Sequence, residues 1–303
     1  MSPTVAQDVA EKIRVGVAGW SYPDWNGIVY PQGTRDLLGY LSRYVDVIEI
    51  NSTFYRPPER PLVQRWLQRT ERRPDLVFCA KLHRDVTHHG RVEPAMVRSF
   101  HTALAPLKDA GRLAHLLAQF RWDFADTEDT RGHLRNMRNR FGDLANLALE
   151  LRHASWQRND ALEFLAALGV TVANLDYPTA SNSFNMRLCP VGRDAYLRLH
   201  GRNRAAWFDK KAGRDRTYDY CYSDAEIDDI VERAAALGEM SRSLTLIANN
   251  HFAGKEVLNA LEIKSRLTGE KVDVPPGLAK RYPRANRIAK TPPAPRQPEL
   301  PLG

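Results

Sequence analysis

The most constraining feature of this sequence is a regular alternation of short apolar runs with stretches of helical periodicity. Each run is rich in apolar and β-branched residues and has the length of a strand. The stretches between them, such as "PLVQRWLQRT" and "AEIDDIVERAAALGEM", repeat apolar residues with the period of an amphipathic helix. The sequence therefore predicts eight strands, at residues 15–20, 47–51, 76–82, 113–120, 146–151, 170–176, 195–201 and 244–250.

Strands that alternate with helices form parallel sheets through right-handed crossovers. Eight such units in about 270 residues predict a single (β/α)8 TIM-like barrel of the α/β class. One unit differs, because residues 177–194, between the sixth and seventh runs, contain no clear helix. A doubly wound open sheet is the alternative. The chain has neither a G-x-G-x-x-G loop nor a P-loop, so no dinucleotide or nucleoside triphosphate site supports that alternative.

The basic charge of the chain is concentrated near its C-terminus. From residue 271 onward there are seven basic and two acidic residues, which account for +5 of the net charge of +8. The same segment ends in the proline-rich stretch "TPPAPRQPELPLG", a composition typical of extended, disordered chain. We therefore expect an N-terminal extension at 1–13, a barrel at 14–270 and a disordered basic tail at 271–303.

Composition also bounds the cellular context and the cofactors. No stretch approaches the roughly 20 apolar residues of a membrane span, and the first residues lack the apolar core of a signal peptide. We expect a cytoplasmic protein with no membrane partner. Its three cysteines, Cys79, Cys189 and Cys221, are far apart and odd in number, which argues against a disulfide framework or a structural zinc site.

The predicted strands carry polar residues on one face, toward their carboxyl ends. In the second run, Ile48 and Ile50 form one face, and Val47, Glu49 and Asn51 form the other. In a barrel the polar face points inward and opens at the carboxyl ends of the strands, where barrel enzymes keep their sites. The same rule collects Trp20, Glu49, Asn51, Lys81, Gln119, Glu150, Arg152, Asp176, Arg198, His200, Asn249 and His251 at one mouth.

A structural explanation competes with a functional one for these residues. Ion pairs such as Glu49 with Lys81, or Glu150 with Arg198, would close the barrel interior. Burying so many charges costs several kcal/mol each unless they are paired. The size of the set therefore favours a pocket.

Several motifs resemble the YecE-like family, also called the domain of unknown function seventy-two. They are "GWSYPDW", "VIEINSTFYRPP", "KLHRDVTH", "ALELRHASW", "YLRLHGR" and "NNHFAGKEVLNA", spread over residues 14 to 270. The resemblance implies a TIM-barrel fold with an uncharacterised activity, and a relation to sugar isomerases and barrel endonucleases at the level of the fold. The matching motif residues are Trp20, Trp25, Glu49, Asn51, Tyr55, Lys81, His88, Glu150, Arg152, Trp156, Asp176, Arg198, His200, Arg202, Asn250, His251 and Asn259.

The chemistry of this set favours an enzyme that acts on a small anionic, polyhydroxylated substrate, such as a sugar phosphate or a nucleotide unit. Glu49 or Glu150 is the expected base, and Lys81 or His200 the electrophilic partner. The other expected groups fall into four classes. Asp176 completes the catalytic set; Arg152, Arg198 and Arg202 bind the anion; Trp20, Trp25, Trp156 and Tyr55 offer flat faces; and Asn51, His88, Gln119, Asn249, Asn250 and His251 contact the substrate.

Two further chemistries stay open. Glu49, Glu150, Asp176, His200 and His251 have ligand types suited to a divalent metal, but the lysine and arginines on the same face oppose such an ion. We therefore predict no metal and no cofactor. Lys81 can also form a Schiff base if its surroundings remove its proton, whereas an ion-paired lysine is the structural alternative.

The last residues suggest a different kind of partner. Gln297, Leu300 and Leu302 follow a Q-x-x-L-x-L spacing similar to the peptides with which bacterial DNA-repair proteins bind the sliding clamp. A nucleic-acid-processing or DNA-repair accessory protein, recruited through this tail, is thus the second functional hypothesis. A non-catalytic barrel that binds a metabolite is the third.

Overall fold

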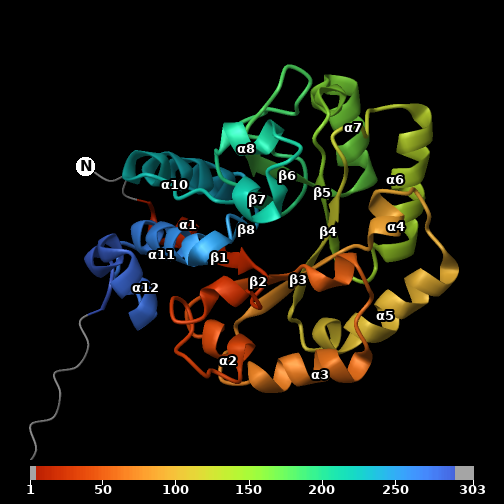
Figure 1. The fold of residues 1–303 in the computed structure, drawn as a ribbon. Helices are drawn as coiled ribbons and strands as arrows, with labels where there is room; N and C mark the ends of the chain where they lie inside the picture. The colour runs from red at the N-terminus through yellow and green to blue at the C-terminus, as the bar shows by residue number, and fades with distance from the viewer. Residues whose placement is uncertain (1–4, 291–303) are drawn as a thin grey trace, which may run out of the picture.

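In the computed structural model, which describes residues 5–290, eight parallel strands close into a barrel (Figure 1). Each strand pairs with its neighbour in chain order, and the eighth pairs with the first. The predicted TIM-like barrel is confirmed, and the open sheet is excluded. The strands are β1 (Ile13–Ala18), β2 (Val47–Ile50), β3 (Val77–Lys81), β4 (Leu113–Gln119), β5 (Asn146–Glu150), β6 (Thr171–Asp176), β7 (Ala195–Leu199) and β8 (Leu244–Ala248).

Helices surround the barrel and connect successive strands (Figure 1). The α-helices are α1 (Gln7–Ala10), α2 (Leu37–Leu41), α3 (Arg60–Arg69), α4 (Arg84–Thr87), α5 (Pro94–Asp109), α6 (Glu128–Phe141), α7 (Asn159–Leu168), α8 (Arg204–Phe208), α9 (Gly213–Thr217), α10 (Asp224–Glu239), α11 (Lys255–Thr268) and α12 (Pro276–Arg281). Short 3₁₀ helices are η1 (Pro23–Trp25), η2 (Ser52–Phe54), η3 (Ala154–Gln157), η4 (Phe252–Gly254) and η5 (Pro283–Arg287). As predicted, residues 177–194 between β6 and β7 form no helix. No helix within 5–290 is long and apolar enough to cross a membrane.

Local sequence signals set the ends of the main helices. At the start of α10, the Ser223 side chain accepts a hydrogen bond from the Glu226 amide, and the Glu226 carboxylate accepts one from the Ser223 amide at 2.8 Å. This reciprocal capping box satisfies two amides that have no partner inside the helix. Gly169 ends α7 in the left-handed conformation, with φ of +70°, which favours glycine.

Two apolar layers hold the barrel together. Side chains such as Ile48, Ile50 and Leu149 pack outward against the helices, in the larger cluster. Mostly small and medium side chains, together with the large ring of Tyr196, fill the interior: Ala18, Val47, Val77, Cys79, Leu117, Ala148, Ala173, Leu175, Tyr196 and Ile247. For β2, β3, β5, β7 and β8 this is the division into faces predicted from the alternation of residues.

The division is reversed in β6. Ala173 and Leu175 belong to the interior cluster, so Asn174 and Asp176 lie on the face toward the helices. Asn174 is satisfied there, because its side-chain oxygen accepts from the Cys189 amide at 2.8 Å and its nitrogen donates to the Cys189 carbonyl at 3.2 Å. The predicted inward direction of Asp176 is therefore wrong.

The first part of the segment expected to be a disordered tail is folded. Residues 271–290 contain α12 and η5, which lie beside α11 (Figure 1). Leu278 and Ala285 are fully buried, and Arg284 donates to the buried carboxylate of Glu262 at 2.5 and 2.6 Å. The folded unit therefore extends past residue 270. The residues from 291 onward, with the proposed clamp-binding Gln297, Leu300 and Leu302, lie outside the described part of the chain.

Candidate functional site

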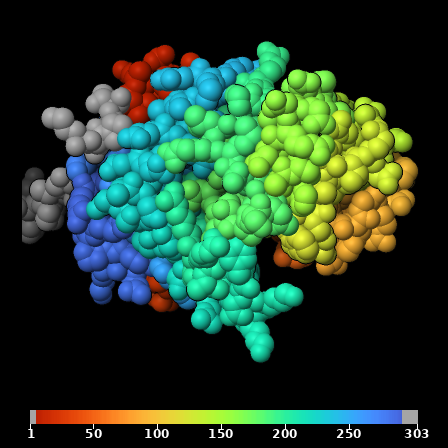
Figure 2. All heavy atoms as spheres, turned by 90° about the horizontal axis from the view of Figure 1, so that it is seen from above, coloured from red at the N-terminus to blue at the C-terminus, as the bar shows by residue number. Residues whose placement is uncertain are grey.

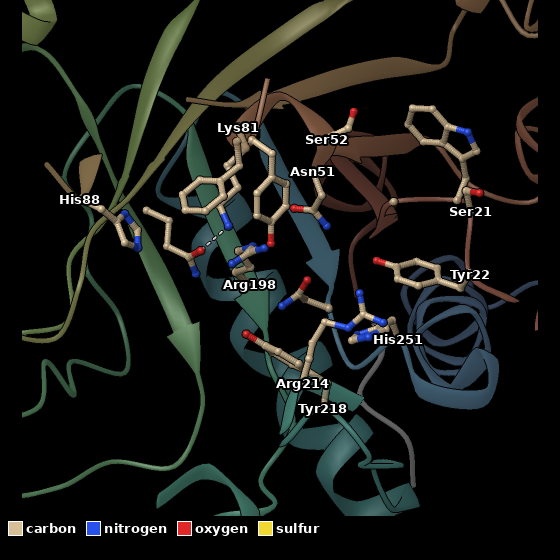
Figure 3. A pocket seen from close by; sticks show the side chains of 16 residues that line it. Ser21, Tyr22, Asn51, Ser52, Lys81, His88, Arg198, Arg214, Tyr218 and His251 are labelled. Carbon is tan, nitrogen blue, oxygen red and sulfur yellow. Dashed lines mark hydrogen bonds between the residues drawn. The ribbon is translucent and has the colours of Figure 1, made fainter. Parts of the chain in front are cut away.

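A cavity of about 590 Å³ opens at the carboxyl ends of the strands (Figure 3). Its walls come from the segments after β1, β2, β7 and β8 and from side chains at the ends of β3, β4 and β7. Figure 3 shows the side chains of Lys81, Arg198 and Tyr218 gathered around one space. The lining residues are Gly19, Trp20, Ser21, Tyr22, Asn51, Ser52, Phe54, Tyr55, Lys81, His88, Gln119, Arg198, Arg214, Tyr218, Asn249 and His251.

A glycine turn after β1 shapes one wall. Gly19 has φ of +91°, a conformation that L-residues with a side chain rarely adopt, and its amide donates to the Glu49 carbonyl at 2.8 Å. The turn brings Tyr22 back over β1, where its hydroxyl donates to the Ala18 carbonyl at 2.5 Å. The Tyr22 ring stacks on His251 with centroids 4.7 Å apart. The two rings form a rigid aromatic side of the cavity.

Arg198 forms the floor of the cavity and holds two carboxylates behind it. It donates to Glu49 from Nε and Nη2, at 3.1 and 2.6 Å, and to Glu150 from Nη1 at 2.7 Å. Glu150 also accepts from Arg152 at 2.6 Å and from Gln119 at 2.6 Å. Burial raises the pKa of Glu150, but the charges of Arg152 and Arg198 outweigh burial and hold this pKa well below its ordinary value.

This network corrects the expected roles of both glutamates. Glu49 and Glu150 are fully buried and do not line the cavity, so neither meets a substrate there as a general base. The predicted pair of Glu150 with Arg198 is confirmed. The predicted pair of Glu49 with Lys81 is not formed, because Glu49 bonds Arg198 and the Tyr196 hydroxyl instead.

Lys81 faces the cavity at the end of β3 and is only 9% exposed. Its amine donates to the side-chain oxygen of Gln119 and lies 4.4 Å from the ring centroid of Phe54. Within residues 5–290 it forms no ion pair with a carboxylate. Burial, followed by the charge of Arg198, lowers the pKa of Lys81 to about 7. At neutral pH the Lys81 amine is therefore present in both its protonated and its neutral form.

Two predicted histidines occupy different positions. His88 lines the cavity, and burial together with the charge of Lys81 lowers its pKa to about 4. His200 is fully buried behind Asn249, whose side-chain nitrogen lies 3.1 Å from its Nδ1. Its Nε2 lies 3.4 Å from Glu150, yet burial lowers its pKa to about 4. His200 therefore supports the wall of the cavity without reaching it.

Asp176 and Arg202 form a separate cluster on the helix side of the barrel wall. Arg202 donates to Asp176 at 3.0 and 2.7 Å and to Glu226 at 3.3 Å, and the Tyr222 hydroxyl donates to Asp176 at 2.8 Å. Neither residue lines the cavity. Asp176 and Arg202 therefore do not have the expected roles in catalysis and anion binding. Their hydrogen bonds instead connect the end of β6 to α10.

Other predicted residues belong to the core. Trp25 and Trp156 are fully buried, and their indole N–H groups donate to the carbonyls of His251 at 2.9 Å and Phe124 at 2.7 Å. Asn250 donates to Asn259 at 2.9 Å and also lies outside the cavity. The residues predicted from the sequence that do line it are Trp20, Asn51, Tyr55, Lys81, His88, Gln119, Arg198, Asn249 and His251.

Part of the lining was not predicted from the sequence. Ser21, Tyr22, Ser52 and Phe54 line the cavity and lie inside the motifs "GWSYPDW" and "VIEINSTFYRPP". The segment between β7 and α10 adds Arg214 and Tyr218, and it projects from the body in the view from above, in blue-green (Figure 2). Nothing in the sequence pattern marks these two residues.

The acidic residues and histidines that have ligand types suited to a divalent metal do not form a metal site. Within residues 5–290, no group of three histidine, cysteine or acidic side chains is arranged to hold a metal. Glu49 and Glu150 are hydrogen-bonded to arginines, and Asp176 lies on the other side of the barrel wall. The side chains that line the cavity carry amine, guanidinium, amide, hydroxyl and aromatic groups.

Comparison with known proteins identifies the family. The family model described as "Protein of unknown function DUF72" matches residues 14–285. A solved DUF72 family protein from Thermotoga maritima is 30% identical, with a TM-score of 0.75 over 84% of this chain and 98% of that one. One from Enterococcus faecalis is 23% identical, with a TM-score of 0.75 over 87% and 98%. The UPF0759 protein YecE of Escherichia coli is 30% identical over 97 residues, only 31% of this chain and 33% of that relative. The chain belongs to the DUF72 family.

Proposed function

We propose that this protein is an enzyme that performs acid–base chemistry on a small anionic, polyhydroxylated substrate, with Lys81 as the group that transfers the proton. The observation that carries the proposal is the state of the Lys81 amine. It lies in a cavity among other cations, without a carboxylate partner in the described chain, and its pKa is about 7. A group with a pKa near the working pH can both take up and release a proton.

The charge of the lining supports an anionic substrate. Lys81, Arg198 and Arg214 line the cavity, and within residues 5–290 none of its lining residues is acidic. Arg198 uses three of its five N–H donors on the glutamates behind it, which leaves two for a ligand. A phosphate or carboxylate would gain charge-assisted hydrogen bonds at this floor.

The remaining lining supports a substrate with several hydroxyl groups. Asn51, Ser52 and Asn249 present groups that both donate and accept hydrogen bonds. Trp20 and Tyr55 offer flat faces of the kind that pack against a sugar ring.

His88 is the proposed partner of Lys81 in proton transfer. Its lowered pKa keeps it a neutral imidazole at pH 7, with one nitrogen able to accept a proton. This assignment moves the acid–base roles from Glu49 and Glu150 to residues that line the cavity.

The test compares matched ligands and variants. Thermal-shift measurements with sugar phosphates and the corresponding neutral sugars should show stabilisation of the wild-type protein by the phosphates. Any ligand found this way is then assayed for turnover. We expect Lys81→Met to keep binding and lose turnover. Equal stabilisation by the neutral sugars, or full turnover by Lys81→Met, would contradict the proposal.

A second function, on nucleic acid, is favoured by one observation. Three large apolar side chains, Tyr55, Trp122 and Phe208, are exposed by 65%, 64% and 49% in the segments that follow β2, β4 and β7 at the mouth of the barrel, Phe208 at the end of α8. Residues 202–219 of the same mouth hold six basic and three acidic residues. Exposed rings beside basic groups can stack unpaired bases and bind phosphates.

Oligonucleotide binding distinguishes the second function from the first. We expect Tyr55→Ser, Trp122→Ser and Phe208→Ser together to weaken binding of a fluorescent single strand. Met240→Ser is the matched control, because Met240 is 48% exposed and ends α10 at the opposite side of the barrel. Equal loss in both variants would overturn this function. A chain ending at residue 290 tests the proposed tail separately.

A further inference from the structure

We propose that Lys81 forms an imine with a carbonyl group of the substrate, and that the substrate is a small aldehyde or ketone carrying an anionic group. This inference rests on the proposed function and deepens it. It assigns to the Lys81 nitrogen a covalent role, as a nucleophile at the carbonyl carbon. The anionic group would lie against the free donors of Arg198 and the guanidinium of Arg214.

The surroundings of the amine favour a nucleophile. Imine formation requires the neutral amine, and a carboxylate beside it would keep the proton on. Here the carboxylates that could have paired with Lys81 are occupied by arginines: Glu49 by Arg198, and Glu150 by Arg198 and Arg152. The Lys81 amine is left with a neutral amide oxygen from Gln119 and the ring of Phe54.

The position of the amine is also suitable. Lys81 ends β3, so a strand of the barrel wall fixes its backbone, and its carbonyl accepts a hydrogen bond from Thr53 at 2.6 Å. Gln119 ends the adjacent β4 and accepts a hydrogen bond from the amine, which faces the cavity. A nucleophile on rigid strands needs little reorganisation before it attacks.

The lowered pKa increases the fraction of the Lys81 amine that is neutral, and therefore nucleophilic, at pH 7. With a pKa of about 7, half of the Lys81 amines are neutral at pH 7. For an ordinary lysine, with a pKa of about 10.4, the neutral fraction is about 1 in 2,500. Lys81 should therefore react with carbonyls ahead of the exposed lysines.

The covalent step balances without an oxidant or a reductant. The lone pair of the neutral nitrogen forms a bond to the carbonyl carbon, and the electron pair of the C=O double bond moves to oxygen, which takes up a proton. The nitrogen then gives up both of its protons and uses its lone pair to form the C=N double bond, while the oxygen takes up a second proton and leaves as water. The products are one imine and one water. Once protonated, the imine draws electrons from the neighbouring carbon, and we assign neutral His88, which lines the same cavity, to accept a proton released there.

The other lysines provide internal controls. Lys264 is ion-paired with Asp46 at 2.6 Å, and Lys255 is ion-paired with Asp219. Lys210 and Lys211 are exposed on the segment between β7 and α10. None of these four amines lines the cavity, so we expect them to react with an anionic carbonyl compound more slowly than Lys81 does.

The experiment traps the imine in the full chain. The protein is mixed at pH 7 with limiting pyridoxal 5′-phosphate, an aldehyde with a phosphate, then reduced with borohydride and digested for mass spectrometry. We expect the adduct on Lys81, at least tenfold above any other lysine. Pyridoxal, which lacks the phosphate, should label Lys81 more slowly. Dihydroxyacetone phosphate, dihydroxyacetone and pyruvate then separate phosphate, neutral and carboxylate ligands.

Variants separate failure of this inference from failure of the proposed function. Lys81→Arg keeps a cation and should lose the adduct while still binding sugar phosphates in thermal shifts. Arg214→Gln should slow labelling by the anionic probes and leave labelling by pyridoxal unchanged. Adducts spread evenly over the exposed lysines would overturn the imine, and the acid–base function would stand if sugar phosphates still bind. Absence of both the adduct and binding would overturn both proposals.

Discussion

Arg198 donates two hydrogen bonds to Glu49, from Nε at 3.1 Å and from Nη2 at 2.6 Å, and both side chains are buried at the mouth of the barrel. Such a fork matches the geometry of a carboxylate and satisfies both of its oxygens. The pair removes a carboxylate from the cavity and leaves the arginine facing it. The same contact therefore stabilises the barrel and makes the cavity cationic.

Loss of this pair should destabilise the fold. We expect Glu49→Ala to lower the free energy of unfolding by about 3–5 kcal/mol, because it leaves part of the Arg198 charge buried and unpaired. The Tyr196 hydroxyl also loses its acceptor. Urea unfolding measures the change. Glu59→Ala is the control, since Glu59 pairs with Arg56 at 3.7 Å on the exposed surface, where ion pairs contribute little. Similar losses in the two variants would contradict the role given to the buried pair.

The pKa of Lys81 should appear in the pH dependence of stability. In the unfolded chain its pKa is about 10.4, whereas in the folded chain it is lowered to about 7 by burial and by Arg198. Above pH 7 the unfolded chain therefore binds more protons at this site, and the free energy of unfolding rises with pH. The slope is at most about 1.4 kcal/mol per pH unit, and it vanishes below the folded pKa.

Comparison of wild type with Lys81→Met isolates this contribution. The difference in unfolding free energy, measured in urea between about pH 6 and about pH 9, should be flat at the acid end and then grow in favour of wild type. Lys211→Met, which changes an exposed lysine outside the cavity, is the matched control. A constant difference for Lys81→Met would show that the amine titrates normally.

Sequence patterns predicted the barrel well because the strands other than β6 are apolar on their outer face. In β2, the outward Ile48 and Ile50 and the inward Glu49 follow the period of two, and the structure places them accordingly. In β6 both faces are buried and both carry polar groups, so alternation alone could not orient the strand. Asn174 and Asp176 are satisfied by Cys189 and Arg202, which lie far along the chain.

The candidate site was predicted in part for the same reason. Polar groups at strand ends converge on one mouth in any barrel, so Lys81, Gln119 and Arg198 were found. The hydrogen-bond partners of these residues were not predicted, because the sequence does not indicate which carboxylate an arginine binds. Trp25 and Trp156 were placed in the site since their ring type suits a sugar, yet each indole N–H has a backbone carbonyl in the core as its partner.

Two arginines of the β7–α10 segment should behave in opposite ways. Arg202 holds Asp176 and Glu226 and does not line the cavity, whereas Arg214 lines it. We expect Arg202→Gln to lower the melting temperature and leave the affinity for anionic ligands unchanged. Arg214→Gln should weaken that affinity, more at low salt, with an unchanged melting temperature. Calorimetric binding and thermal unfolding measure the two effects. If Arg202→Gln alone weakens binding, the assignment of the two arginines is reversed.

The folded segment after α11 should be needed for stability. Leu278 and Val272 are 0% and 8% exposed, and Arg284 neutralises Glu262, which is itself 3% exposed. Burial of each large apolar side chain contributes about 1.5–3 kcal/mol, and Glu262 would be left without its partner. We therefore expect a chain ending at residue 270 to lose several kcal/mol of unfolding free energy in urea. A chain ending at residue 290 keeps every contact described here and should unfold at the wild-type urea concentration. If both truncated chains unfold alike, the segment contributes nothing to the barrel.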